Sequence, residues 1–287
     1  MKPSASIVIP CYNSAGTLMA QLDQLLPQIA ASQAELVLVD NNSTDGTARL
    51  IDQVAQREDV VAVQATARQG ASHARNVGVS VARSDRLLFC DADDVVSERW
   101  VESLVDSLER HSVVTGPLDV TSVNASDVAK SRAGSHAADR PASFYGLFPI
   151  AHGGNMAVTR RAWEEVGPLD ESLDAIEDME WSLRATVAGH TVAHAPRATV
   201  GYRYRTEAVE LWRQGLRYGQ HRPIVARMTY ERLGIRPSRL SGIRSWAWLA
   251  CNLGRARTSH GRAQLAWVAG NRIGNLVGST RARFLVL

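Results

Sequence analysis

The sequence predicts an α/β fold with a mostly parallel central sheet, helices on both faces, and a helical, basic C-terminal extension. Three observations support this. From residue 6 onward, short apolar runs alternate with longer amphipathic ones, which is typical of strands and helices in a parallel sheet. A composition of 45% hydrophobic and 21% charged residues over 287 positions is that of a globular chain with a sizeable core. The final third of the chain is periodic and rich in arginine.

The individual elements follow from apolar patterning and turn residues. Buried strands are predicted at Ser6–Pro10, Glu35–Asp40, Val60–Val63 and Arg86–Cys90. The helices between and after them are predicted at Ala15–Ala31, Gly46–Arg57, Ser72–Ala82 and Glu98–Arg110. Residues 121–143 lack periodicity and predict a mobile loop or lid. A second αβ portion, at 150–204, should contain a helix at about 178–189 and a strand pair near 190–204.

Several protein classes are excluded by simple patterns. No apolar run approaches the roughly 18 residues of a membrane-spanning helix, and the N-terminal apolar stretch is too short for a signal peptide. Cys11, Cys90 and Cys251 are far apart, which argues against a disulfide scaffold or a cysteine-rich zinc site. We therefore expect a cytoplasmic protein.

The net charge of +3 conceals a strong asymmetry along the chain. Residues 205–287 contain fifteen arginines and three acidic residues, a local balance of +12, whereas the other 204 residues balance at −9. Such a division indicates that the extension faces something anionic while the rest of the chain does different work.

An acidic run follows the predicted strand that ends at Cys90. In parallel sheets, ligands bind beyond the carboxyl ends of the strands. Asp91, Asp93 and Asp94 lie at such a strand end, and short carboxylate side chains there can converge on Mg²⁺ or Mn²⁺. The alternative is that these acids cap the following helix, a role that suits Asp94.

Other strand ends carry residues that suit a nucleotide. Asp40 can accept hydrogen bonds from a base, and Tyr12 can present its ring face to one. Arg68 and Arg75 lie before and on the next helix, where a guanidinium can neutralise a diphosphate. The alternatives are a tyrosine at the rim of the sheet and solvated helix arginines.

The pair Glu177–Asp178 begins the predicted helix of the second portion. Inverting transfer requires one carboxylate to accept a proton from an acceptor hydroxyl, and Asp178 is our candidate for this base. We expect the neighbouring Glu177 to raise the pKa of Asp178. The alternative is that these acids only complement the helix dipole, which fits Glu180.

The ordered set of motifs resembles the family 2 glycosyltransferases of GT-A fold, over roughly residues 4–205. It comprises SIVIPCYN at 6–13, VDNNSTDGT at 39–47, ARNVG at 74–78, DADD at 91–94 and Glu177–Asp178. The resemblance implies a nucleotide-sugar donor (UDP-sugars most often), a divalent metal and inversion at the anomeric carbon. It also implies a catalytic domain at 1–205, with a nucleotide-sugar half at 1–120 and an acceptor and base half at 150–205. Residues 206–287 form the extension.

The resemblance also implies roles for individual positions. Donor contacts are implied for Pro10, Tyr12, Asn13, Asp40, Arg68, Arg75, Asp91 and Ala92. The acceptor side is implied for Gly153, Gly154, Asn155 and Trp181. Asp178 resembles the catalytic base, with Glu177 supporting the acceptor. Asp93 resembles the direct ligand of Mn²⁺ or Mg²⁺, with Asp91 beside it.

One departure from the family pattern concerns histidine. Many relatives place a histidine after the base helix, sometimes as a further metal ligand, but residues 196–205 contain none. His194 lies just upstream, and an ordinary strand histidine is the preferred interpretation for it. Arg203 and Arg205 are candidates for neutralising the donor phosphates instead.

The extension and the acceptor remain open at this level. The arginines, together with Trp246, Trp248, Trp267 and Phe284, suit a peripheral contact with anionic lipid at the inner face of the cell membrane. The alternative is that these aromatic residues pack against the sheet. The acceptor is a lipid-linked saccharide, a polysaccharide, a peptide or a small molecule. The alternative functions are a sugar-phosphate nucleotidyltransferase and a non-catalytic protein that binds a nucleotide sugar or nucleic acid. We expect no specific nucleic-acid partner, because no recognised nucleic-acid motif is present.

Overall fold

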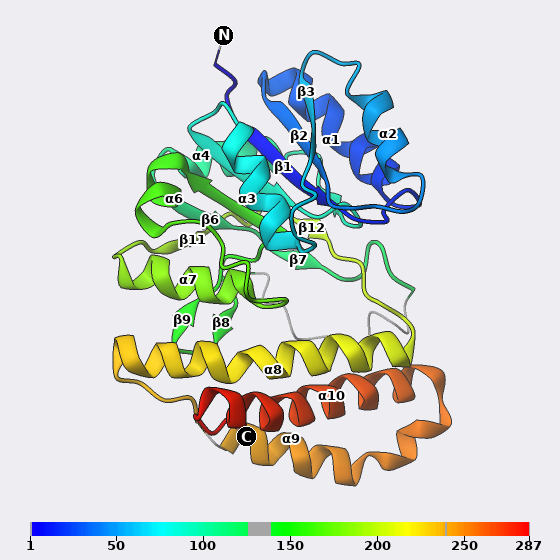
Figure 1. Cartoon of the computed structure of the whole chain (residues 1–287), viewed down its shortest axis with the longest axis vertical. Helices are drawn as coiled ribbons and strands as arrows, with labels where there is room; N and C mark the ends of the chain where they lie inside the picture. Colours follow the sequence, from blue (N-terminus) through cyan, green and yellow to red (C-terminus); the bar gives the residue numbers. More distant parts are fainter. Residues whose placement is uncertain (1, 126–138, 239, 287) are drawn as a thin grey trace.

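The computed structural model describes residues 2–125, 139–238 and 240–286. Most of the segment expected to form a loop or lid, 121–143, therefore lies outside the described residues. Figure 1 shows an upper α/β body and, below it, a layer of long helices made by the C-terminal third of the chain.

A central seven-stranded sheet organises the body, in the order β11-β6-β10-β4-β1-β2-β3. Strands β4, β1, β2 and β3 are parallel, β10 runs antiparallel to both β4 and β6, and β11 is parallel to β6. This confirms the mostly parallel sheet that the sequence predicts. The bounds are β1 (Ser6–Cys11), β2 (Glu35–Asp40), β3 (Val60–Gln64), β4 (Arg86–Cys90), β6 (Val113–Thr115), β10 (Asn155–Thr159) and β11 (Val192–His194).

Helices cover both faces because successive strand residues point to opposite sides. Ile7 and Ile9 of β1 face one hydrophobic cluster, which contains side chains of α1, α2 and α4. Val8 faces a second cluster, with α3, α6 and α7. The helices are α1 (Leu18–Ser32), α2 (Thr47–Val54), α3 (Ala71–Val81), α4 (Trp100–Leu108), α6 (Arg160–Val166) and α7 (Glu177–Val187).

Short strands add two small sheets to the body. β5 (Val95–Val96), β12 (Val200–Gly201) and β7 (Leu118–Asp119) form one, and β8 (Ser143–Phe144) with β9 (Phe148–Pro149) forms the other. The strand pair predicted near 190–204 is thus divided: β11 extends the central sheet, and β12 pairs with β5 and β7.

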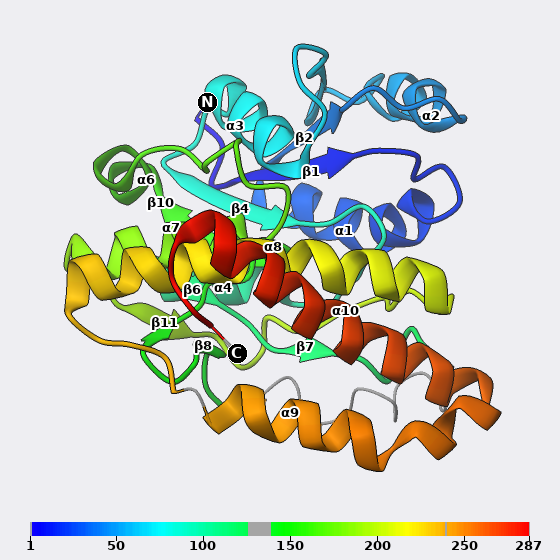
Figure 2. The same cartoon turned by 60° about the horizontal axis from the view of Figure 1, so that its bottom comes forward.

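The extension is helical, as predicted. It consists of α8 (Ala208–Leu233), α9 (Leu240–Cys251), the 3₁₀ segment η1 (Leu253–Arg257) and α10 (Ser259–Ala282). In both views α10 runs alongside α8 (Figures 1 and 2). Their backbones approach closely at glycines: a Cβ at Gly219 would lie 2.4 Å from the carbonyl oxygen of Asn271, and one at Gly274 would lie 2.4 Å from that of Leu216.

Hydrophobic packing joins the extension to the body. Val225 and Ala226 of α8 share a hydrophobic cluster with Ile176, which precedes α7, and Leu183 of α7. The aromatic rings of the β8–β9 hairpin and of Phe284 belong to the same cluster. Phe284 is thus buried, and Trp267 packs edge-on against Tyr218 with ring centroids 5.5 Å apart. No described helix is both long and apolar enough to cross a membrane.

Candidate active site

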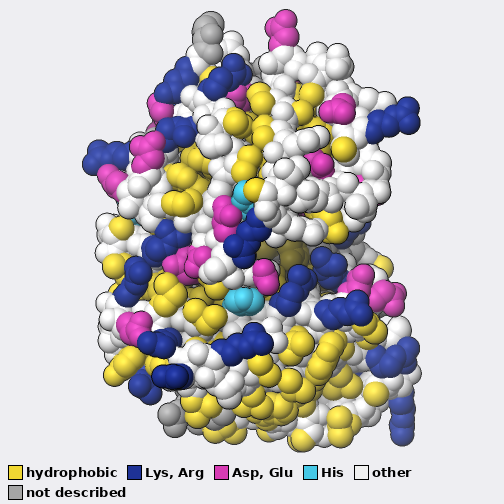
Figure 3. Space-filling view, viewed as in Figure 1, with side chains coloured by type: hydrophobic (Ala, Val, Ile, Leu, Met, Phe, Trp, Pro, Cys, Tyr) yellow, Lys and Arg dark blue, Asp and Glu magenta, His cyan; other side chains and the backbone are white. Residues whose placement is uncertain are grey.

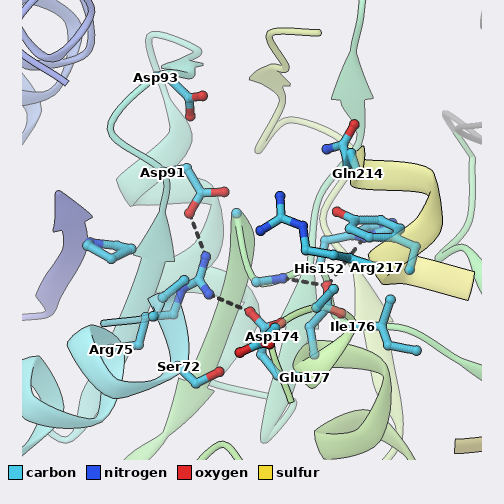
Figure 4. A pocket seen from close by; sticks show the side chains of 18 of the residues that line it. Ser72, Arg75, Asp91, Asp93, His152, Asp174, Ile176, Glu177, Gln214 and Arg217 are labelled. Carbon is cyan, nitrogen blue, oxygen red and sulfur yellow. Dashed lines mark hydrogen bonds and ion pairs between the residues drawn. The ribbon is translucent and has the colours of Figure 1, made fainter. Parts of the chain in front are cut away.

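A cleft of about 1230 Å³ opens at the carboxyl edge of the central sheet. It is lined by the exits of β1 and β4, the loop before α3, the start of α7 and one face of α8 (Figure 4). A volume of this size accommodates a ligand larger than a typical drug molecule. Most of the residues predicted from the sequence line it: Pro10, Tyr12, Asn13, Arg68, Arg75, Asp91, Ala92, Asp93, Gly153, Gly154, Glu177 and Asp178.

Three carboxylates converge at the exit of β4. Asp91, Asp93 and Asp94 each present an oxygen, and these oxygens lie within 4.8 Å of one another. Asp94 is almost fully buried; its Oδ1 accepts a hydrogen bond from the backbone N–H of Arg203 at 2.9 Å, while its Oδ2 is buried with no hydrogen-bond partner among the described residues. Asp94 therefore does not cap α4, the role considered for it from sequence.

Electrostatics in this cluster favour a cation. Desolvation and then the charge of Asp91 raise the pKa of Asp93, and burial with both neighbouring acids raises the pKa of Asp94 well above its usual value. A divalent cation would relieve this repulsion and satisfy the unpartnered oxygen of Asp94. The residues present thus fit an Mg²⁺ or Mn²⁺ ion.

Two glycines allow the chain to pass close to these groups. A Cβ at Gly154 would lie 2.7 Å from Asp91 Oδ2, closer than real Cβ contacts. At Gly153 a Cβ would lie 3.3 Å from the Cζ of Arg75. The Gly153–Gly154 turn therefore leaves the space that the Asp91 and Arg75 side chains occupy.

Arg75 joins the two halves of the cleft. Its Nη2 donates to Asp91 Oδ1 at 2.5 Å and its Nη1 to Glu177 Oε1 at 2.8 Å, although the residue is only 3% exposed (Figure 4). Burial opposes its charge, but Asp91 and Glu177 outweigh this and raise the pKa of Arg75. The guanidinium therefore fixes the acid after β4 relative to the first residue of α7.

The start of α7 presents Asp178 to the cleft. Ile176, the residue before α7, adopts a left-handed conformation with φ 59°, which is unusual for a β-branched residue. Asp178 Oδ2 accepts a hydrogen bond from the N–H of Gly153 at 3.1 Å and lies 3.8 Å from His152 Nδ1.

The expectation of a raised pKa for Asp178 was wrong. Burial raises the pKa of Asp178, but His152 and the N–H of Gly153 outweigh it, so that the pKa is lowered overall. Glu177 is the group with the raised pKa, because burial outweighs the favourable charge of Arg75 and Asp178 adds to it. The sequence shows Glu177 beside Asp178 but not the donors, His152 and the N–H of Gly153, that surround the Asp178 carboxylate in the structure.

The side of the cleft beside the exit of β1 is built from loops that hydrogen-bond to one another. Tyr12 is 51% exposed, with its ring available at the rim. Asn13 Oδ1 accepts from the N–H of Thr44 at 2.7 Å. Asn41 donates to the carbonyls of Ala65 and Arg68, which holds the loop that carries Arg68.

Four predicted residues do not line the cleft. Asp40 is buried and accepts from the N–H of Ser43 at 3.3 Å. Asn155 is fully buried, where it bonds Trp100, Pro117 and Ala198. Trp181 is also fully buried; it stacks on Trp163 and donates to the carbonyl of Gly167, so it belongs to the core rather than to an acceptor surface. His194 lies in β11 outside the described carboxylate cluster.

Sequence reasoning missed a further set of lining residues, of which the most informative come from the extension. Gln214, Arg217, Tyr218 and Arg222 lie on α8, and Gln264 and Trp267 lie on α10. Figure 4 places Gln214 and Arg217 across the cleft from Asp91 and Arg75. The 3–4 residue spacing on α8 was the available signal, but nothing in the sequence says which way that face points.

Two family models match this chain. The profile described as "Glycosyl transferase family 2" matches residues 6–167, and the one described as "Glycosyl transferase family group 2" matches residues 87–271. The chain belongs to glycosyltransferase family 2, and the second match extends through most of the helical extension.

Curated relatives are glycosyltransferases or polysaccharide biosynthesis proteins. The chain is 29% identical over 205 residues to "Glycosyltransferase AglE" of Haloferax volcanii, which covers 67% of this chain and 64% of that protein. It is 27% identical over 228 residues to "Succinoglycan biosynthesis protein ExoA" of Rhizobium meliloti, which covers 76% of this chain and 69% of that protein. The alignments thus span about two thirds of each relative's length.

Solved structures share the fold. The mannosyltransferase PcManGT from Pyrobaculum calidifontis, in complex with GDP-Man and Mn²⁺, aligns with a TM-score of 0.65 at 20% identity and covers 96% of this chain and 88% of that one. TarS of S. aureus, residues 1–349 in complex with UDP, aligns with a TM-score of 0.57 at 17% identity and covers 98% and 91%. These similarities support the GT-A fold that the motifs imply.

Proposed function

We propose that this glycosyltransferase moves a sugar from a nucleoside-diphosphate donor to an acceptor hydroxyl with inversion. The observation that carries the proposal is the Arg75 bridge, which holds Asp91 at the metal-binding edge and Glu177 beside the candidate base in one cleft. Residues 1–205 form the catalytic domain in this proposal, and residues 206–287 supply a further wall of the cleft.

On the donor side, the exposed ring of Tyr12 stacks on the base, and Asn13 and Arg68 frame the nucleotide from their braced loops. Asp91 and Asp93, with Asp94 behind them, would hold Mn²⁺ or Mg²⁺. Such an ion supplies charge stabilisation for the leaving diphosphate. Arg203 and Arg205 add positive charge near Asp93.

We favour UDP as the nucleotide, on the basis of the family motifs and of a structural neighbour solved with UDP. The TarS fragment was solved with UDP, whereas PcManGT was solved with GDP-Man. The transferred group is proposed to be a hexosyl unit.

On the acceptor side, Asp178 removes the proton from the attacking hydroxyl. The N–H of Gly153 and the neighbouring His152 hold its carboxylate ionised and oriented. Glu177 is held by Arg75 and faces the same cleft, where it supports the acceptor. Because the candidate base and the candidate metal ligands come from α7 and the β4 exit, they approach a bound sugar from different elements.

We also propose that the extension attaches the protein to an anionic membrane surface. Hydrophobic side chains gather at the end of the molecule formed by α9 and α10, with arginines around them (Figure 3). The exposed large hydrophobic residues of α9, η1 and α10 include Ile243, Trp246, Leu253, Ile273 and Leu276. Apolar contact framed by basic residues matches an anionic bilayer.

The test of the catalytic proposal is Asp178→Asn. We expect nucleotide binding to persist. The rate at which UDP is released from a UDP-sugar, as the sugar is transferred to water or to an added acceptor, should fall by about 10²–10⁴-fold, the usual contribution of a general base. Asp174→Asn is the matched control, since it removes an exposed carboxylate from the same cleft. Residual activity close to wild type in Asp178→Asn would remove Asp178 from the base role.

A further inference from the structure

One face of α8 points into the cleft. Gln214, Arg217, Tyr218 and Arg222 line it, at intervals of one, three and four residues that place them on one side of a helix. The same face continues to Val225, which is buried in the cluster shared with α7. The polar half of this face is therefore open to the cleft, while its apolar half is anchored.

The anchoring makes this wall rigid. Val225 and Ala226 pack with Ile176, the residue immediately before the Glu177–Asp178 pair. On the opposite side of α8, Gly219 contacts the backbone of α10 so closely that a Cβ would collide with Asn271. The position of the α8 side chains is thus tied to the position of the proposed base.

The positive charge on this wall is not neutralised within the described residues. Neither Arg217 nor Arg222 has a carboxylate oxygen within 4.0 Å among them. Behind the wall, Arg272 of α10 is buried, and burial, with a contribution from the charge of Arg222, lowers its pKa. Arg222 and Arg272 thus bring two like charges close enough to interact.

We propose that Arg217 and Arg222 form a phosphate-binding subsite of the acceptor, so that the enzyme glycosylates an acceptor bearing a phosphate or diphosphate. This inference rests on the proposed transferase function and names its acceptor class. A phosphate ester matches two guanidinium groups in charge and in paired hydrogen-bond geometry, whereas a carboxylate supplies one charge only. The proposed base lies on α7, against which this wall is packed, so the acceptor phosphate lies on the side of the cleft away from Asp91.

The phosphate could belong to a lipid or to a soluble sugar phosphate, and the experiment separates the two. Calorimetric titrations of the full chain use inorganic phosphate, geranyl phosphate and, as the neutral match, geraniol. Each is measured with the protein alone and again with saturating UDP and Mn²⁺. The variants are Arg217→Gln/Arg222→Gln and the control Arg213→Gln, which removes an exposed arginine of α8 that does not line the cleft.

We expect phosphate-bearing probes to bind wild type and Arg213→Gln equally, and the double variant at least about tenfold more weakly, since charged hydrogen bonds are lost. Geraniol, which carries no phosphate, should show no measurable binding. Tighter binding of geranyl phosphate than of inorganic phosphate identifies a lipid-linked acceptor, and equal binding identifies a soluble one. Circular dichroism melts check that the double variant folds.

Two results would overturn the subsite. Binding of both phosphate probes that is unchanged in the double variant would do so, as would the absence of binding to wild type. A failure of the transferase proposal would look different: UDP with Mn²⁺ would not bind, while phosphate binding to the protein alone would still depend on Arg217 and Arg222.

Discussion

At the residue scale, Gly154 shows how a single missing side chain shapes the cleft. A Cβ there would lie 2.7 Å from Asp91 Oδ2, so Asp91 would have to leave its place beside Arg75. We expect Gly154→Ala to weaken metal-dependent nucleotide binding by about 10- to 100-fold, the range seen when groups that position metal ligands are lost. Titration with UDP and Mn²⁺ measures this.

The control for Gly154→Ala is Gly254→Ala, because a Cβ at Gly254 meets nothing within 4 Å. It should bind the nucleotide and metal as wild type does. Equal affinity in both variants would show that the Asp91 position does not matter for binding.

His152 gives a second prediction at this scale, and it concerns pH. The base acts in its ionised form, and His152 helps to lower the pKa of Asp178. Removing it in His152→Ala raises that pKa, so the acidic limb of the kcat–pH profile should move to higher pH. His190→Ala is the control, since His190 pairs with Glu165 away from the cleft. An unmoved acidic limb in His152→Ala would contradict the pKa argument.

How well single residues could be predicted depends on what holds them. Tyr12 and Asp93, which follow β1 and β4, line the cleft as the sequence predicts, because parallel strands end at one edge of the sheet. The resemblance implies an acceptor-side role for Asn155 and Trp181, but both use their polar groups in hydrogen bonds inside the core. Sequence does not reveal such tertiary hydrogen bonds.

At the scale of elements, the contact between α8 and α10 holds in place the face of α8 that lines the cleft. Glycines at the crossing let the two backbones touch, so Gly219→Ala would force them apart. We expect a loss of roughly 1–3 kcal/mol of folding stability from overpacking. Thermal unfolding should show a Tm lower by a few degrees.

Gly16→Ala is a suitable comparison for Gly219→Ala, since a Cβ at Gly16 has open space around it. If Gly219→Ala has the same Tm as Gly16→Ala and wild type, α8 and α10 are not in backbone contact. The periodic sequence predicted these helices, yet their pairing escaped prediction because it depends on glycines that carry no hydrophobic pattern.

At the scale of the whole molecule, the basic residues of the extension lie in two different places. Part of the basic charge of the extension enters the cleft through Arg217 and Arg222, and other arginines surround the apolar end formed by α9 and α10. The sequence predicted an anionic contact for the extension but not this division, since helix orientation is set by packing against α7.

From the apolar and basic residues at the end formed by α9 and α10, we predict membrane binding that depends on salt. Each basic residue near an anionic bilayer contributes on the order of 1 kcal/mol, and salt screens this attraction. Wild type should co-sediment with phosphatidylglycerol vesicles at low salt, less at high salt, and not with phosphatidylcholine vesicles. Ile243→Ser/Leu253→Ser should reduce this binding several-fold. Co-sedimentation that is equal for both lipids and insensitive to salt would contradict the membrane proposal.

The central claim is that the cleft binds a nucleotide together with a divalent cation at the carboxylates after β4. The most direct test is the thermal stability of the purified protein with UDP, GDP or dTDP, each with and without Mn²⁺, for wild type and Asp93→Asn. A ligand at 100 times its Kd stabilises a fold by about 2.7 kcal/mol. We predict a shift in Tm that requires both UDP and Mn²⁺ and is lost in Asp93→Asn. A wild-type protein whose Tm responds to no nucleotide, or an Asp93→Asn variant that responds as wild type does, would contradict it.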